Sequence, residues 1–303
     1  MGKEYSFHKI CIAAIFFFDT IALHIPLSGA KDGELSALII AVACSVLLYF
    51  LWYFIADRLY KSRNDNYIAK AVCFLIIAFL IYASTAAAKN FTDYMNEEVL
   101  IKNARIFILL LFSAICIYLV SKTNEVLAKS ALLLFVFIVI VMTIMLIVSF
   151  KNFEPIKVKE LLKGKVFKRS FIYLCRAFLF PLALAFFSRF AFYNVTVKKD
   201  IWGLVIGAVL IFVCFFSTVA TFTLKFASKI DYPYPMSISV VNIGELYTRM
   251  DGFAYFIFFF SALVRCSVCG FGIKMLLKKA GAKKPFKQTA ILMLASFALS
   301  YVI

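Results

Sequence analysis

Apolar runs of membrane-spanning length alternate with short polar segments along the whole chain. A helix that crosses a bilayer needs about 20 predominantly apolar residues, and nine runs come close to that length. They cover residues 8–28, 35–56, 67–88, 104–121, 128–150, 171–193, 201–225, 252–276 and 288–303. The pattern predicts an all-α polytopic membrane bundle that forms one domain over residues 1–303, with helices one to five at 8–150 and helices six to nine at 171–303.

The basic residues of the connecting segments orient the predicted bundle. Lys and Arg favour the cytoplasmic side of a membrane, and the two most basic of the short inner connections are residues 57–66 and 277–287. We therefore expect the N-terminus inside. The inner connections are then 57–66, 121–129, 197–200 and 277–287, and the outer ones 30–34, 89–103, 151–170 and 226–251. Residues 154–169 mix apolar and basic positions, which is typical of an amphipathic helix lying at the interface.

Composition supports lipid as the solvent of this chain. It is 64% apolar and contains 36 Phe, whereas a soluble domain is roughly 45–50% apolar. Its mean hydropathy is +0.95, and no polar stretch is long enough to form a soluble catalytic domain. The formal net charge is +17, but the Lys and Arg residues gather in short segments between the apolar runs. That placement favours an anionic lipid surface over nucleic acid as the partner.

Few residues are suited to catalysis or to binding a metal. The eight cysteines all lie in apolar runs, where cysteine behaves as a small hydrophobe. Cys266 and Cys269 form a C-x-x-C without a second pair or a neighbouring histidine, so we interpret them as packing residues. The sequence has no phosphate-binding loop, no H-E-x-x-H and no G-x-S-x-G. We expect a protein that is not an enzyme, with no catalytic residue, metal or cofactor.

Charges inside the apolar runs are the main functional candidates, because a charge buried in lipid is costly. Asp19 lies near the middle of the first run, shortly before Pro26. It is either a carboxylate facing a central cavity or a packing partner of a basic residue. Arg265 lies about midway along the eighth run, too deep to reach an interface easily. Asp19 is its candidate partner.

Other charges lie nearer the ends of their runs. We expect Arg176, Arg189, Lys70 and Lys274 to extend their charges to the interface. Pro181 interrupts the sixth run, and a proline removes a backbone donor from a helix. Helices one and six thus both carry a charge or a proline at mid-membrane, as an inverted five-plus-five repeat requires.

Residues 232–272 carry the most specific pattern, YPYPMSISVVNIGELYTRMDGFAYFIFFFSALVRCSVCGFG. An aromatic–proline opening precedes an I-G-x-L-x-x-R-x-D stretch and an aromatic-rich helix with a basic residue near its middle. The pattern depends on Tyr232, Pro233, Ile243, Gly244, Leu246, Arg249, Asp251 and Arg265. This block resembles the spore germination permease family, the B subunits of germinant receptors. Weaker similarity in helix order and spacing extends over nearly the whole chain.

The resemblance implies a fold similar to the amino-acid permeases of the APC superfamily. Those proteins have ten helices in an inverted repeat, with helices one and six unwound around the substrate. Nine helices are predicted here, so we expect the tenth to be missing. The chain also departs from the family at Asp19, Thr20 and Ile21, where a Gly-Ser-Gly break is usual, and after Pro181, where a Gly-Glu pair is frequent.

The resemblance also implies a function. Such a protein senses a small nutrient, often an amino acid, in the spore inner membrane, and works beside the A and C subunits of a germinant receptor to trigger spore germination. The alternative is a secondary amino-acid transporter on the same scaffold, and an integral membrane enzyme or structural scaffold is a third class. For either permease-like function we expect a substrate-binding site made by Asp19, Thr20, Tyr82, Thr85, Phe180 and Pro181.

The same superfamily suggests a role for the charge in helix eight. In its sodium-coupled members a cation bridges helices one and eight. We hypothesise that Arg265 occupies the place of that cation and meets Asp19 or backbone carbonyls of helix one.

Overall fold

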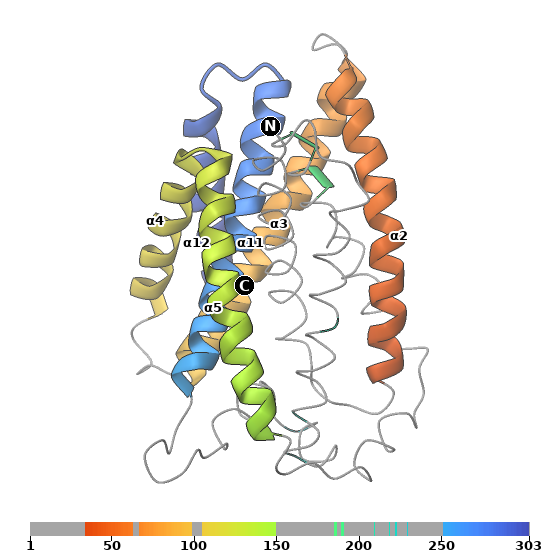
Figure 1. Cartoon of the computed structure of the whole chain (residues 1–303). Coiled ribbons are helices and arrows are strands. Elements are labelled where there is room, and N and C mark those ends of the chain that lie inside the picture. Colours follow the sequence, from red (N-terminus) through yellow and green to blue (C-terminus); the bar gives the residue numbers. More distant parts are fainter. Residues whose placement is uncertain are drawn as a thin grey trace.

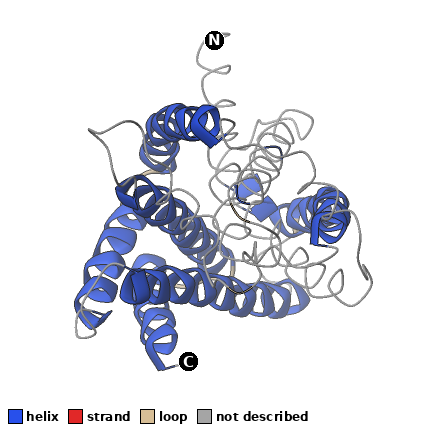
Figure 2. Ribbon diagram, turned by 90° about the horizontal axis from the view of Figure 1, so that it is seen from below, coloured by secondary structure: helices blue, strands red, loops and turns tan. Residues whose placement is uncertain are grey.

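The computed structural model describes residues 34–62, 67–98, 105–149 and 251–302, together with residues 185, 186, 189, 190, 209, 218, 222 and 229. These residues form six helices and no strand (Figures 1 and 2). The helices are α2 (Glu34–Lys61), α3 (Tyr67–Glu98), α4 (Arg105–Ser121), α5 (Asn124–Ser149), α11 (Asp251–Lys279) and α12 (Pro285–Val302). The described part of the chain is therefore all-α, as predicted.

Each of the six helices covers one of the apolar runs predicted to be helical. The predicted helices at 8–28, 171–193 and 201–225 lie wholly or mostly outside the described residues, so the total of nine stays a prediction. Several segments predicted as connections are partly helical instead, as two examples show. Helix α3 continues through Glu98 into the expected outer connection 89–103, and α2 continues to Lys61 in the expected inner connection 57–66.

Both extensions have a local physical cause. In α3, Phe91, Thr92 and Tyr94 are buried, and the Thr92 hydroxyl donates to the carbonyl oxygens of Ala88 and Lys89 at 3.0 Å. In α2, the Lys61 ammonium bonds the Asp57 carboxylate at 2.7 Å, one turn away. Hydropathy detects the lipid-embedded part of a helix, but an amphipathic continuation beyond the membrane leaves only a weak signal.

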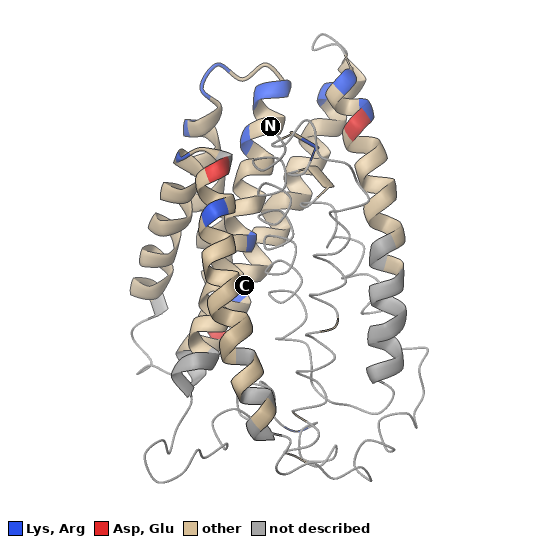
Figure 3. Ribbon diagram, viewed as in Figure 1, with Lys and Arg blue, Asp and Glu red and all other residues tan. Residues whose placement is uncertain are grey.

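The helices run antiparallel in pairs, and three connections lie at one end of the bundle (Figure 1). Helices α2, α4 and α11 end there, and α3, α5 and α12 begin there. Figure 3 shows most of the described Lys and Arg residues at that end. The connections 57–66, 121–129 and 277–287, all predicted to be inner, are therefore placed together. We call this end the inner end.

Helix α11 is the centre of the described bundle. Its most extensive contact is with α3, followed by α12 and α4, and every residue from 261 to 273 is buried. Two glycines allow the close approach. A Cβ atom at Gly270 would lie 2.6 Å from the Met293 sulfur and 2.7 Å from Cγ2 of Val120, and one at Gly272 would lie 2.9 Å from Cδ1 of Leu80. Small residues at helix contacts are typical of packing inside membranes.

The outward faces of the helices carry many large apolar side chains. Large exposed side chains include Ile68, Phe107, Leu133 and Ile291, which are 65–74% exposed. A soluble protein rarely exposes apolar surface on this scale. Among the described residues, two helical stretches, Tyr67–Met95 and Tyr255–Lys279, are long and apolar enough to cross a membrane on length and composition alone. The core helix of a soluble protein also meets that criterion, so the exposed apolar faces are the stronger argument for lipid.

Candidate functional site

Arg265 occupies the central position of α11. It lies fourteen positions after Asp251 at one end of the helix and fourteen before Lys279 at the other, which is about 21 Å in each direction at 1.5 Å per residue. Its side chain is only 3% exposed. The position agrees with the mid-membrane depth predicted from the sequence. A guanidinium at this depth requires partners inside the protein, and such residues usually mark functional sites.

The register between α11 and α3 defines what lies at the level of Arg265. Towards the inner end, Gly272 packs against Leu80. Next to Arg265, the Cys266 sulfur lies 3.6 Å from the Ser84 carbonyl oxygen. Further along, the Phe258 and Tyr94 rings stack with centroids 4.4 Å apart.

Arg265 therefore lies at the level of residues 83–88 of α3, whose sequence is ASTAAA.

Three hydroxyl groups form a buried cluster between α3 and α12. The Ser296 oxygen lies 2.7 Å from that of Ser84 and 2.9 Å from that of Thr85. Ser84 and Thr85 also each donate to the carbonyl oxygen of Ile81 at 2.9 Å. All three side chains are at most 8% exposed. The cluster joins two helices whose residues are more than 200 positions apart in the sequence.

Replacing Ser296 by alanine should lower the free energy of unfolding by about 1 kcal/mol, because hydrogen bonds between membrane helices contribute modestly. Ser84 and Thr85 would keep their bonds to Ile81, so the loss stays small. The measurement is the thermal unfolding midpoint of the purified protein in detergent. A Ser296→Ala variant of normal stability that no longer responds to nutrient would contradict this packing role and place the cluster at the ligand.

An aromatic cluster fills the bundle on the side of Arg265 away from the inner end. Phe91 of α3 stacks on Phe112 of α4 with ring centroids 4.9 Å apart, and Phe259 of α11 contacts both rings. The Phe297 ring of α12 meets Phe112 edge-on at 5.8 Å. Sequence reasoning did not identify this cluster, although the aromatic run YFIFFF at 255–260 was a visible signal.

Two lysines of α11 bind the ends of other helices at the inner end. The Lys274 ammonium donates to the Val120 carbonyl oxygen at 2.9 Å, in the last turn of α4. The Lys279 ammonium donates to the carbonyl oxygens of Tyr60 at 3.0 Å and Ser62 at 2.6 Å, at the end of α2. Carbonyl oxygens in the last turn of a helix lack intrahelical partners and attract cations. Lys274 was expected to extend its charge to the interface, and at the inner end its ammonium group bonds a neighbouring helix.

Arg189 also has a protein partner where the sequence predicted only an interfacial charge. Its guanidinium lies 2.6 Å from the Asp57 carboxylate and 4.8 Å from the centroid of the Tyr60 ring. The hydrogen bond from Lys61, with further help from Arg189, holds the pKa of Asp57 below its ordinary value. The carboxylate therefore stays ionised between these two cations. This contact ties residue 189 to the inner end of α2, the end at which the sequence placed it.

The structure separates the two predicted substrate-binding residues that it describes. Thr85 is buried in the hydroxyl cluster, whereas Tyr82 is 61% exposed on the outer surface of α3. The other four, Asp19, Thr20, Phe180 and Pro181, lie outside the described residues. So do Tyr232, Pro233, Gly244 and Arg249 of the sequence pattern, while Asp251 is the first residue of α11.

Ser267 and the two neighbouring cysteines complete the buried middle of α11. Ser267, Cys266 and Cys269 are all fully buried, and both thiols are free of disulfide bonds. The Ser267 hydroxyl has no hydrogen-bond partner within the described structure. The thiols lie in the helix contact, where packing residues were predicted. The buried middle of α11 thus contains one cation and one hydroxyl among small side chains.

The family model described as "Spore germination protein" matches residues 35–303, which begins at the second residue of α2 and includes Arg265, the hydroxyl cluster and the aromatic cluster. No curated protein matches the chain. The family match confirms the resemblance inferred from residues 232–272.

Proposed function

This chain belongs to the spore germination permease family, and from that membership we propose that it is the B subunit of a germinant receptor. In this proposal it lies in the spore inner membrane and senses a small nutrient such as an amino acid. It acts beside the A and C subunits to trigger germination, and it is not an enzyme. The observation that carries the proposal is a buried arginine at the midpoint of α11, within a membrane helix that the family match covers.

Arg265 would act as the fixed cation of the binding region. Arg265 lies at the level of the small side chains of residues 83–88, and a guanidinium recognises a carboxylate through two parallel hydrogen bonds. That carboxylate is Asp19 of the predicted first helix, in a permease scaffold whose first and sixth helices surround the ligand. A fixed arginine charge would make an added sodium ion unnecessary. The nutrient then binds nearby, among Thr20, Phe180 and Pro181.

The proposal is tested by deleting the gene in its spore-forming host. Spores are then scored for germination on single amino acids, sugars and nucleosides, by the fall in optical density. We expect the response to one nutrient class to disappear and to return when the wild-type gene is restored. An unchanged profile for every nutrient would contradict the receptor function.

Liposomes separate sensing from transport. A receptor that senses its ligand should give no uptake of radiolabelled amino acid above that of empty liposomes. Sustained uptake down an ion gradient would instead support the alternative function, a secondary amino-acid transporter.

A further inference from the structure

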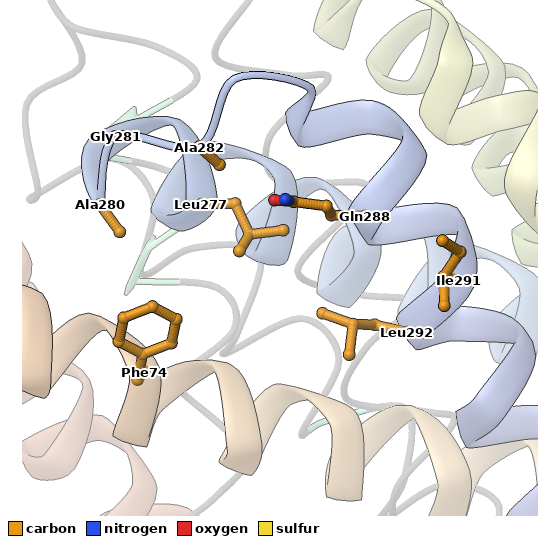
Figure 4. A pocket seen from close by; sticks show the side chains of 8 residues that line it. All are labelled: Phe74, Leu277, Ala280, Gly281, Ala282, Gln288, Ile291 and Leu292. Atoms are coloured by element: carbon orange, nitrogen blue, oxygen red, sulfur yellow. The ribbon is translucent and has the colours of Figure 1, made fainter.

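A groove with an apolar floor lies beside the turn that joins α11 to α12 (Figure 4). Its volume is about 450 Å³. Phe74 of α3 forms one wall, the end of α11 and its turn form the second, and α12 forms the third. The residues that line it are Phe74, Leu277, Ala280, Gly281, Ala282, Gln288, Ile291 and Leu292.

The turn beside the groove is fixed by its backbone. The Ala282 amide donates to the Leu277 carbonyl oxygen at 3.0 Å, and the Gly281 amide donates to that of Lys278 at 3.2 Å. This is a Schellman motif, which needs a left-handed residue after the helix, and Gly281 supplies it with a φ of 92°. The groove is thus preformed by a rigid turn rather than by a loose loop.

The groove opens to the side, towards the surface that faces lipid. Phe74 is 57% exposed and Ile291 is 65% exposed, although both lie on helices of the membrane bundle. The only polar side chain among the lining residues is Gln288. Figure 4 shows its amide extending across the groove towards Leu277.

Three lysines lie four residues before lining residues of this groove, towards the inner end of the bundle. Lys70 precedes Phe74 by one turn of α3, Lys284 precedes Gln288, and Lys287 precedes Ile291 on α12. Residues four apart share a helix face, and helical side chains tilt towards the N-terminus. These lysines lie in or beside the first turns of their helices, so their charges extend towards the inner surface. The sequence from residue 252 to residue 303 contains seven Lys and Arg residues and no acidic residue.

We propose that this groove is a binding site for an anionic phospholipid of the inner leaflet. The phosphate of the headgroup lies between Lys284, Lys287 and the Gln288 amide, with Lys70 opposite. One acyl chain lies along Phe74, Ile291 and Leu292. An apolar floor with a basic rim at the end of membrane helices matches both halves of such a lipid, and basic pockets of this kind bind anionic headgroups. A free phosphate ion would use the rim and leave the floor empty.

The test uses the full chain, purified in detergent and titrated with phosphatidylglycerol while bound lipid is followed by native mass spectrometry. We expect retention of phosphatidylglycerol and a raised thermal midpoint, and neither effect from phosphatidylcholine. The double variant Lys284→Gln, Lys287→Gln should weaken phosphatidylglycerol binding by roughly fivefold for each lysine. Ala282→Trp, which fills the groove without changing charge, should also weaken it.

Lys129→Gln is the matched control. It removes one positive charge near the same end of the bundle, at an exposed lysine 3.9 Å from Glu125. It should leave binding within twofold, whereas each single rim variant, Lys284→Gln or Lys287→Gln, should weaken binding roughly fivefold. Equal binding of phosphatidylcholine would overturn the proposal, as would an equal loss in Lys129→Gln. Protection by inorganic phosphate or glycerol phosphate as strong as that by phosphatidylglycerol would show a small-anion site instead.

Discussion

Spores that carry Arg265→Gln in place of the wild-type protein are expected to lose their response to the nutrient, with a germination rate at least about 100-fold lower. If Arg265 pairs with Asp19 as proposed, removing the guanidinium costs about 3–5 kcal/mol, because the buried carboxylate is left uncompensated. Arg265 is 3% exposed at the centre of its helix, so water cannot replace it. Germination is measured by the fall in optical density, with protein level checked by immunoblot.

Two further variants make this result interpretable. Arg265→Lys keeps the positive charge and should retain part of the response. Lys278→Gln removes a charge from the exposed end of the same helix and should respond normally. A normal response and normal abundance in Arg265→Gln would refute the role of this charge.

Ion replacement tests the same site without mutation. If Arg265 supplies the positive charge between helices one and eight, exchanging sodium for potassium or choline should leave the nutrient response unchanged. A strict sodium requirement would mean that a bound ion is still needed there, contrary to the proposed role of Arg265.

Gly270→Val is expected to destabilise the protein by about 3 kcal/mol, near the upper end of the cost of inserting atoms into a packed core. Even the first added carbon would lie 2.6 Å from the Met293 sulfur and 2.7 Å from Cγ2 of Val120. Methionine can move aside, but the β-branched valine is stiff. The thermal midpoint in detergent measures the loss.

Smaller changes at the same contact give the controls. Gly270→Ala should be destabilising, and Val120→Ala in the same chain should restore part of the lost stability by removing the blocking methyl group. Gly272→Ala meets only the mobile end of Leu80 at 2.9 Å and should cost less. Ala298→Val, at an exposed position of α12, should have little effect. A Gly270→Val variant as stable as Ala298→Val would contradict the close packing of α11 against α4 and α12.

The helices were predictable because lipid imposes a simple rule on sequence. An apolar run near 20 residues long is hard to explain otherwise, and the runs at 67–88 and 252–276 both lie within observed helices. The depth of Arg265 followed from counting along its run. The C-terminal ends of α2 and α3 could not be predicted from the apolar runs. Their last turns are amphipathic and are held by contacts such as that of Asp57 with Lys61.

Contacts between distant helices could not be predicted from one sequence. Thr85 was predicted to line the substrate-binding site, and the structure places its hydroxyl 2.9 Å from that of Ser296. Nothing in the apolar runs 67–88 and 288–303 indicates that these two helices contact each other. Lys274 likewise was predicted only as an interfacial charge, and its contact with the end of α4 became visible in the structure. Residue type was readable from the sequence, whereas the partner depends on the tertiary arrangement.

The lysine contacts of α11 have a consequence for how the protein is made. The chain emerges from the ribosome N-terminus first, so α2 and α4 enter the bilayer long before α11 is synthesised. Lys274 reaches back 154 residues to Val120, and Lys279 reaches back 219 residues to Tyr60. Until those lysines arrive, the carbonyl oxygens at both helix ends depend on water or lipid headgroups. A polypeptide arrested before residue 274 is therefore an incomplete assembly intermediate, open at its inner end and exposed to membrane quality control.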